Sequence, residues 1–190
     1  MAATDLCTLS QVLKYLKIGD DADDKTNDIL EKFITEKTKA ITNYIGYTQI
    51  LAQDYTEYYD GDDGKYLFVY NTPIVSVASL YDDIEWDYGS DTLVDSDNYK
   101  IVDSRYIVRK DAVFNKYDQN IKITYNAGFA TIPADLNGVC IEEVARSFSE
   151  KGNIGITSRS DSKGGVTRVE KGWMKQSLDV LNIYVKELVI

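Results

Sequence analysis

The feature that most constrains the fold is a change of hydrophobic period along the chain. From Tyr55 to Tyr125, apolar and aromatic residues alternate with polar ones in short runs such as KYLFVY, IVSVASLY and NIKITY. Turn formers such as DGDDG and DYGSD separate these runs. A period of two is typical of strands with one buried face, and short strands joined by turns favour antiparallel pairing. The middle of the chain therefore predicts an antiparallel β-meander.

Two helices are predicted before this middle segment. Thr8 and Gln11 have the spacing of a capping box, which predicts a helix start at Thr8, and Gly19 is expected to end that helix. The second helix follows the polar run DDADDK, and Gly46 supplies its stop. Their apolar stripes are Leu9, Val12, Leu13 and Leu16 in the first helix, and Leu30, Phe33, Ile34, Ile41, Tyr44 and Ile45 in the second. We expect the two stripes to pack together.

Two more helices are predicted after the middle segment. Pro133 suits the first turn of a helix, Asp135 suits its positive N-terminal end, and Gly152 is expected to close it. The fourth helix is expected to reach the C-terminus. Its apolar residues cover most of its circumference, so a helix of this kind must be buried, either as a central core helix or against a neighbouring subunit or partner.

These elements predict an α+β fold that is mostly helical, with a small antiparallel β-meander inserted between N-terminal and C-terminal helices. With 190 residues and 44% apolar content, we expect a single domain over 1–190. Its expected parts are N-terminal helices at 8–46, an acidic β-rich insertion at 54–130, a helix at 133–151, a flexible assembly loop at 152–172 and a C-terminal helix at 173–190.

The composition excludes most site chemistry. The chain has no histidine and no phosphate-loop, dinucleotide or nucleophile-elbow pattern, so we expect no enzyme, no cofactor and no metal site. Three acidic runs fail the calcium-loop pattern, because ligand positions hold Lys25, Gly64 and Tyr99. Cys7 and Cys140 lack CxxC spacing and are expected to be buried free thiols. No apolar run is long enough for a membrane span and no secretory signal is visible, so we expect a cytoplasmic location.

The charge of the chain, −10 in all, is uneven. Residues 47–131 hold fifteen acidic and seven basic residues and twelve of the fifteen tyrosines. The stretch 151–175 instead holds six basic residues against two acidic ones. Because DNA affinity depends on phosphate neutralisation, the acidic middle disfavours DNA binding, and the basic stretch lacks the interleaved aromatics of a stacking site.

The junction TYNAGFATIPADL, residues 124–136, resembles the head-tail connector (adaptor, or head-completion) proteins of tailed bacteriophages. The resemblance extends to the opening helix LSQVLKYLKI, the second helix ending in NYIG, the segment YYDGDDGKYLFVYNTPIVSVASLY and a final helix after a Gly/Ser-rich loop. Gly128 and Pro133 are its fold markers: glycine permits a sharp turn off the sheet, and proline presets a helical turn. The acidic segment 84–99 departs from the family pattern.

The resemblance implies a non-enzymatic ring of roughly twelve copies in the virion, and it allows a monomeric free chain. The implied partners are copies of itself, the portal protein and a stopper or tail-completion protein, with double-stranded DNA passing through unbound and no membrane involved. The implied location is the virion neck, and the host cytoplasm during assembly. An acidic channel wall would let DNA slide, because it repels phosphate.

The expected assembly residues lie in the basic stretch and the last helix. Arg159, Lys163 and Arg168 would meet acidic neighbours, VTRVEKG would pair as an extended edge, and Trp173 would anchor the entry to the helix. On the helix itself the expected contacts are Leu181, Tyr184, Val185 and Leu188. A plain solvated linker is the alternative for the stretch. For the whole chain, the alternatives are an acidic, tyrosine-rich module that binds carbohydrate or a host protein, and an enzyme with paired carboxylates.

Overall fold

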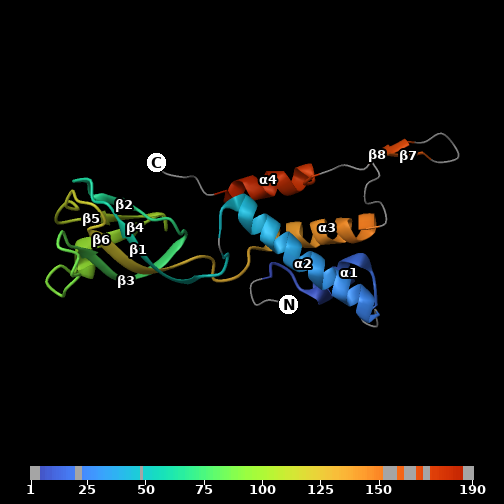
Figure 1. Cartoon of the computed structure of the whole chain (residues 1–190), viewed down its shortest axis with the longest axis horizontal. Helices are drawn as coiled ribbons and strands as arrows, with labels where there is room; N and C mark the ends of the chain where they lie inside the picture. The colour runs from blue at the N-terminus through green and yellow to red at the C-terminus, as the bar shows by residue number, and fades with distance from the viewer. Residues whose placement is uncertain are drawn as a thin grey trace. The chain divides into compact units, whose positions relative to one another are not determined.

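The computed structural model describes residues 5–19, 23–47, 49–151, 158–160, 166–168 and 172–185. It divides into two compact units, one built from residues before 49 and after 131, the other from residues 49–131. The described residues form four α-helices and small antiparallel sheets, which confirms the α+β class. Figure 1 shows helices α1 to α4 in one unit and strands β1 to β6 in the other. The expectation of a single domain stays a prediction.

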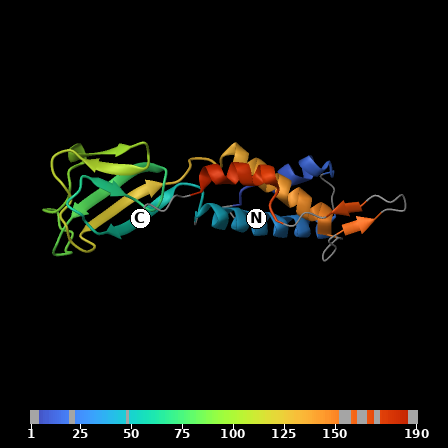
Figure 2. The ribbon, with the colours of Figure 1, turned by 90° about the horizontal axis from the view of Figure 1, so that it is seen from above.

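The helical unit consists of four helices: α1 (Leu9–Leu16), α2 (Asp24–Ile45), α3 (Ala134–Glu150) and α4 (Lys175–Tyr184). Helix α1 packs against α2 and α3, and α4 packs against the same two helices (Figure 2). The first of these contacts confirms the expected pairing of the N-terminal helices. The buried side chains are mainly apolar and come from all four helices: Val12, Leu13, Leu30, Ile34, Ile41, Ile45, Leu136, Val139, Val144 and Leu181.

The ends of α1 and α2 follow their capping signals with one correction. The capping box at Thr8 is confirmed, since its backbone N–H donates to Gln11 Oε1 at 2.8 Å and its hydroxyl accepts from the Gln11 N–H. Helix α1 ends at Leu16, where Lys17 adopts a left-handed conformation and its N–H bonds to carbonyls of the last turn. The expected stop at Gly19 is therefore wrong, because the chain closes the helix two residues earlier. Gly46 ends α2 as expected, with φ of 80°.

Helices α3 and α4 also differ from expectation at their ends. Pro133 lies just before α3, at the N-cap with φ of −54°, instead of inside the first turn. Its fixed φ leads into the helix from that position as well. Helix α4 stops at Tyr184, and Val185 has extended backbone, so the helix does not continue unbroken through 190. The β-branched Ile183 and Val185 have low helix propensity. Gly152 and residues 186–190 lie outside the described residues.

The two cysteines meet in the core of the helical unit. Cys7 and Cys140 are both buried and free, as expected, and their sulfur atoms lie 3.2 Å apart in an S–H···S hydrogen bond. Thr38 on α2 joins them, since it accepts the Leu6 N–H at 3.0 Å and lies 3.9 Å from the Cys140 sulfur. These contacts fix the segment before α1 onto α2 and α3.

The strand unit contains two three-stranded antiparallel sheets. In the first, β6 (Ile121–Ala127) lies between β1 (Gln53–Tyr59) and β3 (Ile74–Asp82). In the second, β5 (Tyr106–Arg109) lies between β2 (Tyr66–Phe68) and β4 (Tyr99–Val102), and a short 3₁₀ helix, η1 (Ser96–Asn98), precedes β4. Antiparallel pairing is therefore as expected, but the strand order is not that of a meander.

The strand order follows from the burial of β6. One face of this strand is entirely buried, through Ile121, Ile123, Tyr125 and Ala127. A central strand pairs on both edges and buries more of its surface than an edge strand, and β6 is the most buried strand of its sheet, with no exposed residue. The alternation of apolar and polar residues shows that a segment is a strand, but it does not show which other strands pair with it.

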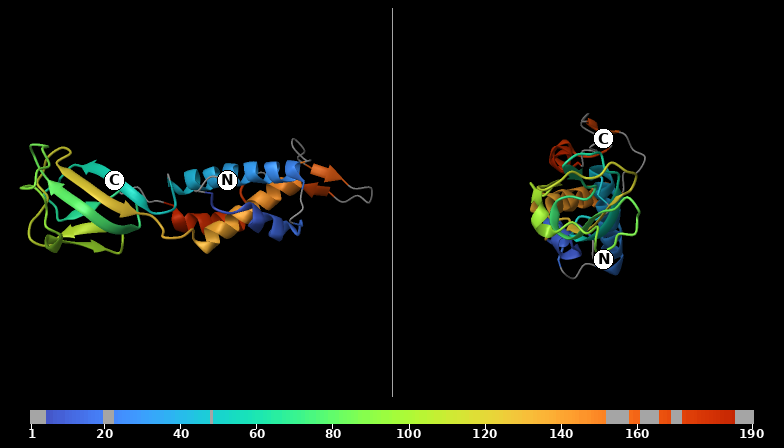
Figure 3. Two further views of the ribbon diagram at one scale, coloured as in Figure 1. Left: turned by 90° about the horizontal axis from the view of Figure 1, so that it is seen from below. Right: turned by 90° about the vertical axis from the view of Figure 1, so that its left-hand side faces the viewer.

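One apolar core fills the space between the two sheets, which form two layers (Figure 3). The first sheet contributes Leu80, Ile123 and Tyr125, and the second contributes Leu67 and Ile107. A buried ion pair also joins the layers, with Arg109 Nη1 on β5 lying 3.1 Å from Asp82 Oδ2 on β3. The strand unit is therefore a small sandwich with two outward faces.

Gly128 performs the role expected of a fold marker. Its φ is +127°, and a Cβ atom there would lie 2.7 Å from backbone atoms of Ala52. Both facts restrict this position to glycine, because other residues rarely adopt this φ and a side chain would collide with the backbone.

Among the described residues, no helix is long and apolar enough to cross a membrane.

We predict that both cysteines are unreactive in the folded protein. The hydrogen bond that Cys7 donates to Cys140 raises the pKa of Cys7, as burial also does, and lowers the pKa of Cys140. Both sulfur atoms are buried, so a reagent in solution reaches neither thiol while the protein is folded. A thiol-specific chromogenic reagent should therefore titrate almost no thiol in the native protein and two thiols in guanidinium chloride. Two thiols titrating rapidly without denaturant would contradict the buried pair, and none in denaturant would show a disulfide.

Candidate assembly surface

The position of α4 depends on a buried carboxylate. Glu143 on α3 has no exposed surface, and its Oε1 accepts the Ser177 hydroxyl at 2.8 Å and the Met174 N–H at 3.1 Å. Met174 is the N-cap of α4 and provides no side-chain cap of its own. Glu143 therefore caps α4 from a neighbouring helix, and its negative charge lies at the positive N-terminal end of α4.

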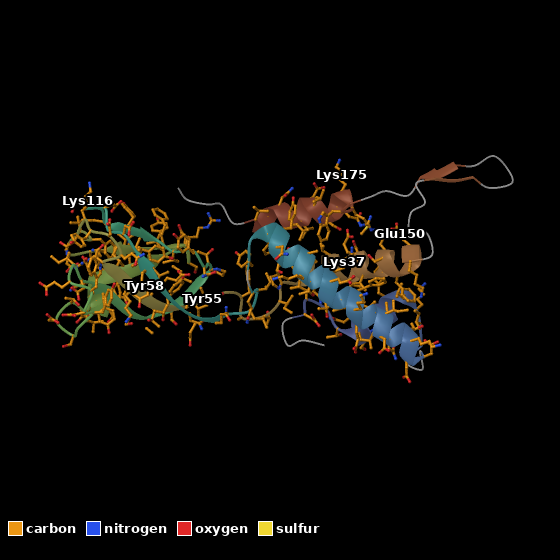
Figure 4. All side chains as sticks on the ribbon, viewed as in Figure 1. Lys37, Tyr55, Tyr58, Lys116, Glu150 and Lys175 are labelled. Atoms are coloured by element: carbon orange, nitrogen blue, oxygen red, sulfur yellow. The ribbon has the colours of Figure 1, made fainter. Side chains whose placement is uncertain are left out.

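The charge of Glu143 is balanced by Arg146, one turn later on α3. Arg146 Nη2 donates to Glu143 Oε2 at 2.8 Å, and it also donates to the carbonyl oxygen of Gly172. Glu143 and Arg146 thus bind the backbone of both Met174 and Gly172, next to Lys175 at the start of α4, which is labelled in Figure 4. A buried charge without partners is costly, so this arrangement fixes the position of Gly172 and Met174 on α3.

Trp173 packs against its own subunit. Its ring centroid lies 6.2 Å from that of Tyr44 on α2, and Lys37 Nζ lies 5.8 Å from the Trp173 centroid. The Tyr44 hydroxyl donates to Asn182 Oδ1 on α4 at 2.8 Å. Trp173 remains half-buried, so part of its ring is open to a neighbour.

The far end of α4 is tied to the start of α3. The Tyr184 hydroxyl lies 2.7 Å from both carboxylate oxygens of Asp135. Burial and this hydrogen bond raise the pKa of Tyr184 to about 12, so the hydroxyl stays a donor at neutral pH. Both ends of α4 are therefore held by carboxylates of α3, Glu143 at one end and Asp135 at the other.

The outward side of α4 is apolar in part. Leu181 is fully buried by the helices of its own unit, and so it offers nothing to a partner while α4 is docked. Ile183, in contrast, is 75% exposed, and Val185 is 40% exposed. Leu188 lies outside the described residues. Of the residues expected to contact a partner, Val185 is thus exposed and Tyr184 is half-buried. Ile183 is more exposed than either but was not among the expected contacts.

The basic stretch contains a short antiparallel pair of strands, β7 (Ser158–Ser160) and β8 (Val166–Arg168). Arg159 lies in β7 opposite Thr167, and Arg168 ends β8 opposite Ser158. The VTR part of the expected edge strand therefore pairs with its own chain. Lys163 lies outside the described residues. Contacts of Arg159, Lys163 and Arg168 with a partner stay predictions.

Sequence reasoning missed Glu143, although a signal was present. The apolar stripe of α3 runs through Leu136, Cys140 and Val144, and Glu143 lies beside it at helical spacing. A charged residue on an apolar stripe indicates a buried partner.

Among the described residues, no three metal-ligating side chains come together.

The family model of head completion proteins matches residues 5–167. The chain belongs to the head completion protein family. No curated protein matches it. Among solved structures, a chain of the neck of an empty gene transfer agent particle, solved with C6 symmetry, has a TM-score of 0.61 at 16% identity, over 100% of this chain and 95% of the other.

Two further structures of gene transfer agent particles resemble this head completion protein. A chain of the native virion has a TM-score of 0.58 at 14% identity, over 96% of this chain and 90% of the other. A chain of the native neck, solved with C12 symmetry, has a TM-score of 0.52 at 16% identity, over 100% and 95% of the two chains. At these identities the likeness shows a shared fold across the whole chain.

We predict that Glu143→Ala detaches α4 from α3. The substitution removes the cap of α4 and leaves Arg146 without its partner, which should lower the free energy of unfolding by about 3 kcal/mol. Urea unfolding measures the loss, and hydrogen exchange should show faster exchange confined to α4. The matched control is Glu142→Ala, which removes a partly exposed carboxylate that only accepts from Gln176. Equal stability of the two variants would contradict the capping role.

Proposed function

We propose that this head completion protein is a structural virion protein that forms a ring between the portal and the tail or stopper. The observation that carries the proposal is the likeness, over the whole chain, to chains of gene transfer agent necks solved with C6 and C12 symmetry. Membership of the head completion family supports the same position in the particle. The role is assembly and not catalysis.

The partners follow from this position. In a ring of about twelve copies, each chain meets two neighbours through two different surfaces, and the ring as a whole meets the portal on one side and the stopper or tail on the other. The open apolar residues of α4, Ile183 and Val185, are the surface we assign to one of these contacts. The protein would be made in the host cytoplasm and would end in the virion neck.

The charge of the strand unit supports a channel for DNA. Residues 49–131 carry a net charge of −8, and a wall of this charge repels phosphate, so that a duplex passes without being held. A basic wall would bind DNA and slow its passage. This argument concerns the strand unit alone.

Four tyrosines of the strand unit, which could suggest a carbohydrate-binding module, have structural contacts. The ring centroid of Tyr55 lies 5.9 Å from that of the buried Tyr125. The hydroxyls of Tyr59 and Tyr125 both donate to Glu57. Tyr58 lies over Lys122, whose amine is 5.9 Å from its ring (labelled Tyr55 and Tyr58 in Figure 4). These four rings have contacts within the sandwich, and the ring protein is the better supported function because the family and the shared fold favour it.

We predict that the full-length protein forms rings on its own portal. Native mass measurement of the portal mixed with this protein should show an added mass of about twelve chains of 21.5 kDa each. Ile183→Ser should lower this loading, because it removes an open apolar contact, whereas Tyr15→Ser on α1 should not. A portal that gains no more than one or two chains would contradict the proposal.

The same measurement decides the role of the basic stretch. Changing Arg159, Lys163 and Arg168 together to serine should reduce ring formation if these residues meet acidic neighbours. Unchanged loading of the triple variant would leave 152–172 as a plain linker, without affecting the proposal of a ring.

We also predict poor binding of duplex DNA. The strand unit repels phosphate, so a fluorescent 30-base-pair duplex should show no submicromolar binding at physiological salt. The control is the same titration at low salt, where weak binding through the basic stretch would appear and vanish as salt is added. Submicromolar binding at physiological salt would instead indicate a DNA-binding protein.

A further inference from the structure

The two outward faces of the strand sandwich differ in chemistry. The β1-β6-β3 sheet presents mainly polar residues such as Thr56 and Thr124, whose hydroxyls lie 3.1 Å apart, and Asn126, whose amide donates to Asp54 at 2.7 Å. The two rings on this face, Tyr58 and Tyr81, lie beside the amine of Lys122, 5.9 and 5.8 Å from it. Such a face is suited to water. The β2-β5-β4 sheet instead presents what we call the aromatic sheet face, formed by Tyr66, Phe68, Val102, Tyr106 and Val108.

Strand register establishes that these five residues share one face. Leu67 and Ile107, which pair with each other, are buried in the core, so the residues on either side of each point outward. The outward rings contact one another, with the Tyr106 centroid 5.2 Å from that of Phe68 and 5.9 Å from that of Tyr66. Tyr66 is 57% exposed and Phe68 is 46% exposed. Contiguous exposed aromatic residues of this kind mark an interaction site.

The charges at this face are basic, although the unit as a whole is acidic. Lys100 is the one charged residue among those that point outward from the three strands. Lys65 and Arg105 are exposed and directly precede β2 and β5, while the β4–β5 turn adds one acid, Asp103. These account for three of the seven basic residues in 49–131. The face therefore suits a partner that is apolar and acidic.

The same chain carries a surface with that chemistry, the loop 83–98. It contains six acidic residues and no basic one. It also exposes Ile84, Trp86 and Leu93 about half-way. Five acids remain on its surface, since Asp83 is buried.

The loop is held in a defined shape. Asp83 accepts the N–H groups of Glu85 at 2.9 Å and Tyr88 at 2.6 Å, and these bonds lower the pKa of its carboxyl group. Trp86 donates from Nε1 to the Asp118 carbonyl at 2.9 Å. A loop fixed in advance loses little entropy when it binds, so its exposed apolar side chains are ready for a partner.

We propose that the loop 83–98 of one copy binds the aromatic sheet face of the next copy. The inference rests on the proposed ring and names a contact within it. Each copy carries both surfaces, which gives the head-to-tail contact that a closed ring needs. The aromatic rings supply the apolar anchor, and Lys65, Lys100 and Arg105 opposite the acidic loop fix the orientation and exclude a face-to-face pairing of two basic faces.

Cysteine cross-linking of the full-length protein tests this contact. A Phe68→Cys chain is mixed with a Leu93→Cys chain, and oxidised dimers are measured on a non-reducing gel. The two positions are equally exposed, at 46% each, and the native cysteines are buried. The control mixture pairs Leu93→Cys with Tyr15→Cys, from an exposed position on α1. The Phe68 and Leu93 mixture should yield at least about tenfold more mixed dimer than the control, since docking raises the effective concentration of the thiols.

Three results would overturn the contact. Equal yields in the test and control mixtures would do so, and dimers formed by Phe68→Cys alone would show that two aromatic faces meet each other. The third result concerns Tyr66→Ser, which should weaken self-association at least about tenfold. The control, Tyr15→Ser, changes a similarly exposed tyrosine and should leave self-association unchanged. Unchanged self-association of Tyr66→Ser would contradict the contact.

The portal mass measurement separates this inference from the proposed function. Rings on the portal together with no specific cross-link would leave the ring intact and remove the loop contact. A specific cross-link without rings would retain the contact and contradict the ring.

Discussion

The helical unit depends on the buried carboxylate of Glu143. A negative charge inside an apolar core must be paired, and here its partners are Arg146, the hydroxyl of Ser177 and the N–H of Met174, the N-cap residue of α4. Because α4 has no side-chain cap of its own, this glutamate decides where α4 begins and against which helices it lies. The exposure of Ile183 follows from that docking, since burying Leu181 on one side leaves Ile183 on the other.

The strand unit depends instead on one central strand. By pairing on both edges, β6 joins β1 and β3, and its buried side chains form much of the core against the second sheet. Two carboxylates of this unit also stabilise it. Asp82 forms an ion pair with Arg109 between the sheets, and Glu57 accepts a hydrogen bond from the Tyr125 hydroxyl. Much of its acidity is thus compatible with a stable sandwich, because buried acids are hydrogen-bonded and the others lie in water.

An assembly protein acts through surfaces, and this one has few features that suggest chemistry. Without histidine and without a cluster of metal ligands in the described residues, the features that stand out are an open apolar edge on α4, an aromatic sheet face and a rigid acidic loop. Such surfaces match the requirements of a ring, in which each copy must recognise another copy by a different patch. The chain belongs to the head completion family, and the proposed ring would use these surfaces.

The sequence by itself determined what depends on neighbours a few residues apart. The capping box at Thr8, the stop at Gly46, the turn at Gly128 and the alternating strands are all local, because hydrogen bonds and backbone angles within one turn decide them. Only the tertiary structure decided which distant segments meet. It placed β6 between β1 and β3, and it brought Cys7 to Cys140 across 133 residues of chain. It also buried Glu143, since burial depends on what the whole chain packs against a position and not on the residue or its near neighbours.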